Sequence, residues 1–297
     1  MVKCNHMKYI SQIICALCCW LLMLPIAECA PFDALTAETA ILVDARTGEV
    51  LYEKDADKRI YPASTTKMMT AILAIENVNP LKITTVSEHA AKTEGSSAQL
   101  RAGDRVQMQD LLYGLMLSSG NDAAVVIAEY IDGSEKEFAK RMTKKAHDIG
   151  ATKTNFTNAN GLPDDKHYTT ARDLAKIASY AYQNKRFKRI VKIKDRSIRI
   201  SNTGRVIKLH NTNQLLNTMK ECDGIKTGTT RAAGQCLVAS ATKGDTSLIA
   251  IVMKVENGKR WQEAKRLLEY GFDKKTKKIR NNTSNKTDNK AEKKKAA

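Results

Sequence analysis

Three short motifs supply the residue types that a serine acyl-enzyme needs. They are Ser64-x-x-Lys67, Ser119-Gly120-Asn121 and Lys226-Thr227-Gly228, in this order along the chain. Alone, each has an ordinary structural interpretation as a helix cap, a turn, or a strand that runs into a turn. A nucleophile, a base and a second lysine in three separate segments together predict one catalytic centre.

Ser64 and Lys67 are three residues apart, so on a helix their side chains share one face. Pro62, followed by a Ser/Thr cluster and apolar residues at helical spacing, predicts that a helix begins here. A lysine can accept the proton of a serine hydroxyl only when it is neutral, and desolvation and the nearby charge of Lys226 would lower its pKa. We therefore predict Ser64 as the nucleophile and Lys67 as the general base.

The other two motifs are predicted to bind the substrate and to move a proton. Ser119 can relay a proton between the base and the leaving amine, and the Asn121 amide can bind a substrate carbonyl. Lys226 can attract a substrate carboxylate, and a strand edge at this position can pair with an extended peptide. The N–H groups of Thr229 and Ser64 can form an oxyanion hole.

Two further matches lack this context. Ser240 and Lys243 repeat the Ser-x-x-Lys spacing, but Ser240 is expected at the end of a strand. Tyr182 and Asn184 imitate the second motif, but they fall near the C-terminus of a predicted helix. Neither pair is predicted to be catalytic.

The elements that must position the motifs follow the order strands, helices, strands, helix. We expect a hairpin over 40–54, helices over 109–117, 122–131, 134–149 and 170–182, extended segments over 190–200, 205–209, 224–227, 235–241 and 247–255, and a closing helix over 260–270. Strands at the two ends of the chain can share one sheet. The predicted fold class is therefore α/β (α+β): an antiparallel sheet from both chain ends, flanked by helices, with an inserted all-α subdomain.

The wording around the motifs resembles the serine-type D-alanyl-D-alanine carboxypeptidases, the low-molecular-mass penicillin-binding proteins of peptidase family S11. The resemblance extends from about Ala34 to Phe272. The segments that carry it are Tyr61-Pro62-Ala63-Ser64, Ser118-Ser119-Gly120-Asn121-Asp122-Ala123, Asn160-Gly161-Leu162-Pro163 and Asp223-Gly224-Ile225-Lys226-Thr227-Gly228.

The resemblance implies a β-lactamase-like fold and removal of the terminal D-alanine from peptidoglycan stem peptides, without a cofactor. β-Lactams would be covalent inhibitors. It also implies the site residues: Ser64, Lys67, Ser119, Asn121 and Lys226 as catalytic, with Thr227, Gly228, Thr229 and Arg260 binding substrate. For Arg260, a solvent-facing helix charge is an equal alternative. Thr212 stands where some members carry an arginine, which puts one electrostatic contribution in doubt.

Three other functions use the same scaffold. A β-lactamase needs a base for deacylation, commonly a glutamate with an asparagine four residues on. Glu129, Glu135 and Glu137 lack that asparagine and are expected to be exposed, which disfavours this class. A D,D-endopeptidase acting on cross-links would use the same residues. A non-catalytic wall-binding protein fits poorly with an intact set of motifs.

Residues 1–29 are predicted to be a signal peptide, with an uncleaved anchor as the alternative. Lys3 and Lys8 precede the apolar run 10–26, and small residues follow at Ala27-Glu28-Cys29. We therefore expect an exported protein of the cell envelope, with the enzymatic domain over 30–273.

Cys222 and Cys236 are the cysteines expected in the mature chain. They could form a disulfide outside the cytoplasm or remain two buried thiols, and the sequence leaves both open. We predict no metal site, because the cysteines and histidines show no ligand spacing.

The formal net charge is +17, and the segment 274–297 carries ten Lys or Arg residues against two acids. Without an apolar period, it is predicted to be a disordered basic tail. Export makes nucleic acid an unsuitable partner, whereas an anionic membrane or wall polymer fits the charge.

Overall fold

The computed structural model describes the backbone of residues 35–295. It describes the side chains and their burial as far as Lys278. The predicted signal peptide, residues 1–29, lies outside the described residues. Within 35–295, none of the helices combines the length and apolarity that a membrane span requires.

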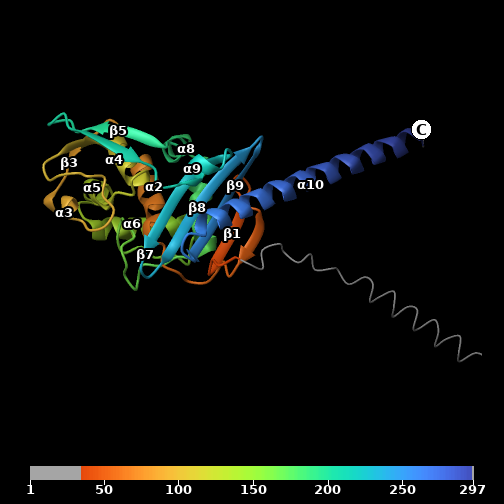
Figure 1. Ribbon diagram of the computed structural model, residues 1–297, viewed down its shortest axis with the longest axis horizontal. Coiled ribbons are helices and arrows are strands. Elements are labelled where there is room, and N and C mark those ends of the chain that lie inside the picture. Colours follow the sequence, from red (N-terminus) through yellow and green to blue (C-terminus); the bar gives the residue numbers. More distant parts are fainter. Residues whose placement is uncertain (1–34, 296–297) are drawn as a thin grey trace, which may run out of the picture. The chain divides into compact units, whose positions relative to one another are not determined.

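A five-stranded antiparallel sheet joins the two ends of the described chain (Figure 1). Its strands, in spatial order, are β2 (Val50–Lys54), β1 (Thr39–Asp44), β9 (Thr246–Val255), β8 (Gly234–Lys243) and β7 (Cys222–Thr230). Ile41 lies opposite Ile251, and Thr227 opposite Leu237. This confirms the predicted sheet and places the third motif on the edge strand β7.

Helices form most of the regular secondary structure between β2 and β7. The helices are η1 (Ala63–Thr66), α2 (Lys67–Asn77), α3 (Glu88–Ala91), α4 (Met108–Met116), α5 (Asn121–Asp132), α6 (Glu135–Asp148), α7 (Ala171–Gln183), α8 (Lys185–Val191) and α9 (Leu215–Thr218). The insertion is not all-α as predicted, because it also contains two small sheets, β3 (Ile83–Thr85) with β4 (Arg105–Gln107), and β5 (Asp195–Arg199) with β6 (Val206–His210).

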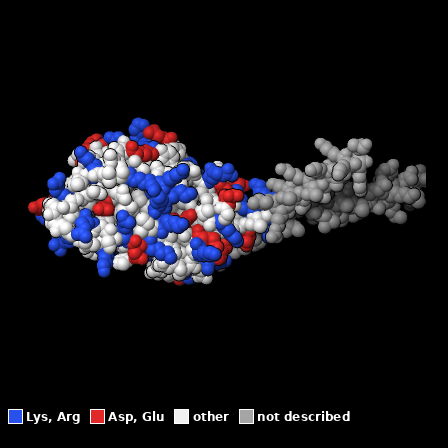
Figure 2. Space-filling model, turned by 90° about the horizontal axis from the view of Figure 1, so that it is seen from above, with Lys and Arg blue, Asp and Glu red and all other residues white. Residues whose placement is uncertain are grey.

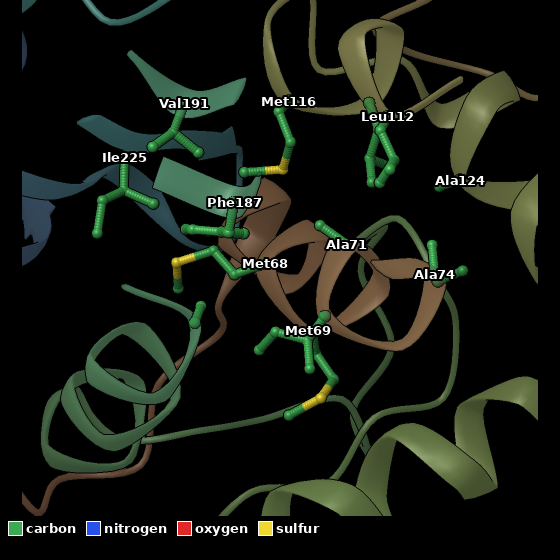
Figure 3. Packing of buried hydrophobic residues seen from close by; sticks show 14 of the residues in the cluster. Met68, Met69, Ala71, Ala74, Leu112, Met116, Ala124, Phe187, Val191 and Ile225 are labelled. Carbon is green, nitrogen blue, oxygen red and sulfur yellow. The ribbon is translucent and has the colours of Figure 1, made fainter. Parts of the chain in front are cut away.

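Helix α2 lies in the core and carries Lys67, the predicted general base, at its first residue. Its side chains from Lys67 to Ala74 are all buried. Figure 3 shows Met68 beside Phe187 of α8, near Ile225 of β7. Burial of each large apolar side chain contributes about 1.5–3 kcal/mol. The start of α2 is therefore fixed between the helical insertion and the sheet.

Helix α8 ends at Val191 and so includes the first two residues of a segment, 190–200, that was predicted to be extended. The strand β5 occupies the later part of that segment. The side chain of Asn184 caps α8 by accepting hydrogen bonds from the N–H groups of Arg186 and Phe187. Phe187, Ile190 and Val191 then place buried side chains on one helical face. The sequence predicted a strand from Ile190 because Ile190 and Val191 are consecutive apolar residues, a pattern that a short buried helix face and a strand share.

The C-terminal helix α10 (Arg260–Lys295) is much longer than the predicted helix over 260–270. Where the sequence predicted a disordered tail, 274–297, the structure continues the helix to Lys295. No glycine or proline interrupts this stretch, and lysine is a good helix former. The amine of Lys275 also binds Glu49 on the β1–β2 hairpin at 2.7 Å, which ties the continuation to the sheet.

Cys222 and Cys236 are two buried free thiols. In the β7–β8 register Cys222 pairs with Ala241, which is five residues from Cys236 along β8. Five residues of strand span about 17 Å. A disulfide requires Cα atoms within about 7 Å, so the buried-thiol interpretation holds.

Candidate active site

Ser64 lies in the one-turn helix η1, directly before α2. The turn is closed by Thr65, whose N–H and hydroxyl both donate to the carbonyl of Pro62, at 3.2 and 2.6 Å. Ala63 has a φ of +48°, an unfavourable conformation for a residue with a side chain. The chain thus bends sharply just before the predicted nucleophile and leaves its hydroxyl half-buried.

Lys67 is fully buried, and its amine reaches Ser64 as predicted. Nζ lies 2.9 Å from Ser64 Oγ, and it donates to Asn121 Oδ1 at 2.6 Å and to the Asn160 carbonyl at 2.6 Å. Burial first, and then the positive charge of Lys226, hold the pKa of Lys67 well below its usual range. The site therefore favours the neutral amine that proton abstraction requires.

Lys226 occupies the middle of β7 and is also buried. Its Nζ donates to the Thr227 carbonyl at 3.0 Å. Burial, followed by the charge of Arg260, lowers the pKa of Lys226 to about 7. A substrate carboxylate bound beside Lys226 would be a negatively charged partner, and it would favour the protonated form of this lysine.

Gly228 lets β7 approach the nucleophile closely. A Cβ at this position would lie 3.2 Å from the N–H nitrogen of Ser64 and 3.2 Å from the Pro62 carbonyl. The next residue, Thr229, is therefore beside Ser64, where the predicted oxyanion hole requires it. Arg260 Nη1 donates to Thr229 Oγ1 at 2.8 Å, so the structure places Arg260 at the site rather than in solvent.

The second motif meets Lys67 from α5, through contacts of Asn121 that the sequence did not predict. Its amide oxygen accepts from Lys67, and its Nδ2 donates to the Glu94 carbonyl at 2.5 Å. Both polar atoms of Asn121 thus orient the base. The hydroxyl of Ser119 is buried, and among the described residues it has no hydrogen-bond partner, which leaves it available to exchange a proton.

Several supporting side chains were not predicted. Thr212 Oγ1 lies 2.7 Å from Thr227 Oγ1, on the strand that holds the third motif. His167 links the catalytic turn to the loop 157–162. Its Nε2 lies 2.8 Å from Thr66 Oγ1, and its Nδ1 accepts from the Thr157 N–H at 3.1 Å. Burial lowers the pKa of His167 to about 4, so this imidazole is neutral near pH 7. Thr212 and His167 each stand in a stretch of polar residues, outside the three motifs, so the sequence does not distinguish them from their neighbours.

Glu135 was predicted to be exposed but is half-buried beside the site. Its Oε1 accepts from the Ala159 N–H at 3.0 Å and from Asn160 Nδ2 at 3.2 Å. Asn160 in turn accepts from Lys67 through its carbonyl. Glu129 is also half-buried, paired with His89, whereas Glu137 is exposed. Glu135 therefore braces the loop that holds the general base.

Replacing Glu135 with glutamine should shift the acid limb of penicillin acylation to lower pH. The Glu135 charge, like that of Asp122, raises the pKa of Lys67, against burial and Lys226. Glutamine keeps the acceptor oxygen but removes the charge, so Lys67 would become neutral at lower pH. Acylation rates measured between pH 5 and 9 test this. Glu137→Gln, an exposed change on the same turn of α6, should leave the profile unshifted.

The two imitations of the motifs are structural. Ser240 lies inside β8 rather than at its end, and its hydroxyl donates to Asp223 at 2.6 Å. The hydroxyl of Tyr182 donates to the same carboxylate at 2.6 Å. Within 35–295, no group of three or more His, Cys, Asp or Glu side chains is arranged to hold a metal ion.

Comparison with known proteins identifies the family. A family model described as D-alanyl-D-alanine carboxypeptidase, peptidase S11, matches residues 26–257. The chain is 38% identical over 242 residues to the D-alanyl-D-alanine carboxypeptidase DacF of Bacillus subtilis, covering 80% of this chain and 62% of that protein. It is 37% identical over 243 residues to the D-alanyl-D-alanine carboxypeptidase of Streptomyces sp. strain K15, covering 76% of this chain and 84% of that protein. The chain thus spans less than two thirds of the Bacillus protein.

Solved structures show the same similarity. The crystal structure of the Streptomyces K15 DD-transpeptidase superposes with a TM-score of 0.76 at 34% identity, over 80% of this chain and 98% of that chain. The D-alanyl-D-alanine carboxypeptidase DacD from Francisella tularensis gives a TM-score of 0.76 at 32% identity, over 80% of this chain and 70% of that chain.

Proposed function

Because the chain belongs to the S11 family of D-alanyl-D-alanine carboxypeptidases, we propose that it removes the terminal D-alanine from peptidoglycan stem peptides. The observation that carries the proposal is the fully buried Lys67, whose amine lies 2.9 Å from Ser64 Oγ and whose pKa is strongly lowered. A neutral lysine beside a serine hydroxyl is a base and nucleophile pair for acyl transfer.

In the first half of this reaction, Lys67 takes the proton of Ser64 as Oγ attacks the carbonyl of the scissile bond. The N–H groups of Ser64 and Thr229 stabilise the resulting oxyanion, and each such donor typically contributes about 2.7–4 kcal/mol. The C–N bond then breaks. The proton returns from Lys67 through Ser119 to the leaving amine, and D-alanine departs.

In the second half, water attacks the ester on Ser64 and gives a proton to Lys67. The bond between the acyl carbon and Ser64 Oγ then breaks, Lys67 returns the proton to Oγ, and the shortened peptide leaves. During the first half, Lys226 and the Thr227 hydroxyl bind the carboxylate of the terminal D-alanine, with Arg260 nearby. β-Lactams would acylate Ser64 by the same first step. We expect their ester to persist, because Glu135, the glutamate beside the site, uses its Oε1 to hold the loop at Ala159 and Asn160.

The test is to follow two products side by side. A peptide ending in D-Ala-D-Ala should release free D-alanine over many turnovers, whereas penicillin should be hydrolysed slowly after one equivalent has bound. Rapid penicillin hydrolysis without D-alanine release would instead make the protein a β-lactamase. A cross-linked dimeric peptide in the same assay would reveal endopeptidase activity.

We further propose that the protein is exported and that the basic end of α10 holds it near an anionic membrane or wall polymer. Each lysine near an anionic surface contributes about 1 kcal/mol before screening by salt. Figure 2 shows that Lys and Arg also spread over the folded domain, so some attraction would not depend on the tail.

A chain that ends at Lys278 should lose most of its salt-sensitive binding to anionic vesicles and keep its turnover of a soluble peptide. This end point retains the contacts of Lys274, Lys275 and Lys278 with the β1–β2 hairpin. Co-sedimentation at low and at high salt measures the difference. If the full mature chain ignores anionic vesicles at low salt, the tail has no such role.

A further inference from the structure

Two neighbouring cavities beside the catalytic turn together form a groove. Two cavities of about 280 and 520 Å³ share the lining residues Tyr61 and Ala232. Tyr61 lies three residues before Ser64, and Ala232 follows Gly228 by four residues, on the chain that passes closest to Ser64. Both cavities therefore lie on one side of the catalytic turn, past the C-terminal end of β7.

The direction of a bound peptide follows from the proposed function, on which this inference rests. The C-terminal carboxylate would lie at Lys226 and Thr227, and the scissile carbonyl between the N–H groups of Ser64 and Thr229. The peptide must then run opposite to β7, so its residues upstream of the scissile bond pass Thr230 toward the two cavities. An extended chain advances about 3.3 Å per residue, so the third or fourth upstream residue reaches them.

The walls of the groove are fixed by hydrogen bonds. On one side is Asp165, in the loop that continues from Asn160, and on the other is the turn at Ala232 and Ala233. Tyr61 lines both cavities, and its hydroxyl donates to Asp165 Oδ1 at 3.3 Å. The groove is thus shaped by the same turn and loop that position Ser64 and Lys67.

The far end of the groove holds a guanidinium in a set orientation. Arg59 stacks over the ring of Tyr168 at 3.4 Å from the ring centroid, and its Nη2 donates to the Asp165 carbonyl at 2.8 Å. No carboxylate within the described part of the chain forms an ion pair with Arg59. Glu38, which lines the same cavity, is paired with Lys58 and Lys254, at 3.2 and 2.6 Å.

We propose that this cavity is a substrate subsite, in which Arg59 binds the carboxylate of an acidic residue three or four positions upstream of the scissile bond. A planar guanidinium matches a carboxylate with two parallel hydrogen bonds. Stacking on Tyr168 holds Arg59 in place before the substrate arrives, which reduces the entropy lost on binding. The apolar methyl groups of Ala232 and Ala233 leave room for the peptide opposite.

The test uses two blocked peptides that end in D-Ala-D-Ala and differ only in glutamate or glutamine at the third position upstream of the scissile bond. The wild-type protein should prefer the glutamate peptide in kcat/KM by about fivefold at low salt, the size expected of one partly exposed ion pair. Arg59→Gln should bring the ratio close to one, and Arg59→Lys should retain part of it. Lys82→Gln removes an exposed positive charge outside both cavities and should leave the ratio unchanged.

The possible outcomes separate the two proposals. Equal rates on both peptides with the wild-type protein, or an unchanged ratio in Arg59→Gln, would overturn the subsite and leave the proposed function standing. Release of no D-alanine from either peptide would overturn the proposed function and the subsite with it. Penicillin labelling of Arg59→Gln reports whether that variant keeps a folded catalytic turn.

Discussion

Lys67→Arg should slow acylation by penicillin by about 10²–10⁴-fold, the range expected when a general base is lost. Arginine keeps the positive charge, but its guanidinium stays protonated and cannot accept the Ser64 proton. In the structure, burial and Lys226 make the neutral form of Lys67 accessible, and neither effect can neutralise a guanidinium to the same degree.

Lys226→Arg is the matched comparison, because both lysines are buried and both variants conserve charge. The proposed role of Lys226 is to attract a carboxylate, which arginine can also do, so this variant should lose less acylation activity than Lys67→Arg. Stopped-flow acylation measures both rates, and thermal unfolding shows whether each variant is folded. Equal, small losses in the two variants would contradict the assigned roles.

Gly161→Ala should abolish acylation by displacing the catalytic turn. A Cβ on Gly161 would lie 1.9 Å from the carbonyl oxygen of Ala63 and 2.4 Å from its carbonyl carbon, which backbone atoms cannot accommodate. Gly161 also has a φ of +88°, where a residue with a side chain is strained. The residue that must move, Ala63, directly precedes the nucleophile.

Gly150→Ala separates the collision from the strain. Its φ of +85° is nearly the same, but its Cβ would meet only the side chain of Lys176, at 3.9 Å. This variant should lose about 1 kcal/mol of stability and acylate normally. If Gly161→Ala acylates as fast as Gly150→Ala, the loop does not fix the position of Ser64.

The parts of the site that the sequence predicted are those encoded by local spacing. Ser64 and Lys67 are one turn apart, so their contact needs only a helix that begins at the right residue. The motif at Lys226 lies in a strand whose apolar neighbours fit a buried sheet. The family resemblance that these motifs suggested is confirmed by the family model and by the relatives.

The parts that the sequence did not predict depend on contacts between distant segments. Glu135 begins an amphipathic helix whose first turn is otherwise polar, so its sequence position indicates a solvent-facing charge. Only the fold brings the loop with Ala159 and Asn160 against it. The contacts of Asn121 with Lys67 and with the Glu94 carbonyl were missed for the same reason, because they join segments that are distant in the sequence.

The most direct test of the central claim is to identify the residue that penicillin acylates. The full mature chain is incubated with a fluorescent penicillin and digested, and the labelled peptide is sequenced by mass spectrometry. The account predicts one adduct, on Ser64, that disappears in Ser64→Ala while the variant still unfolds cooperatively. An adduct on Ser240, or undiminished labelling of Ser64→Ala, would contradict it.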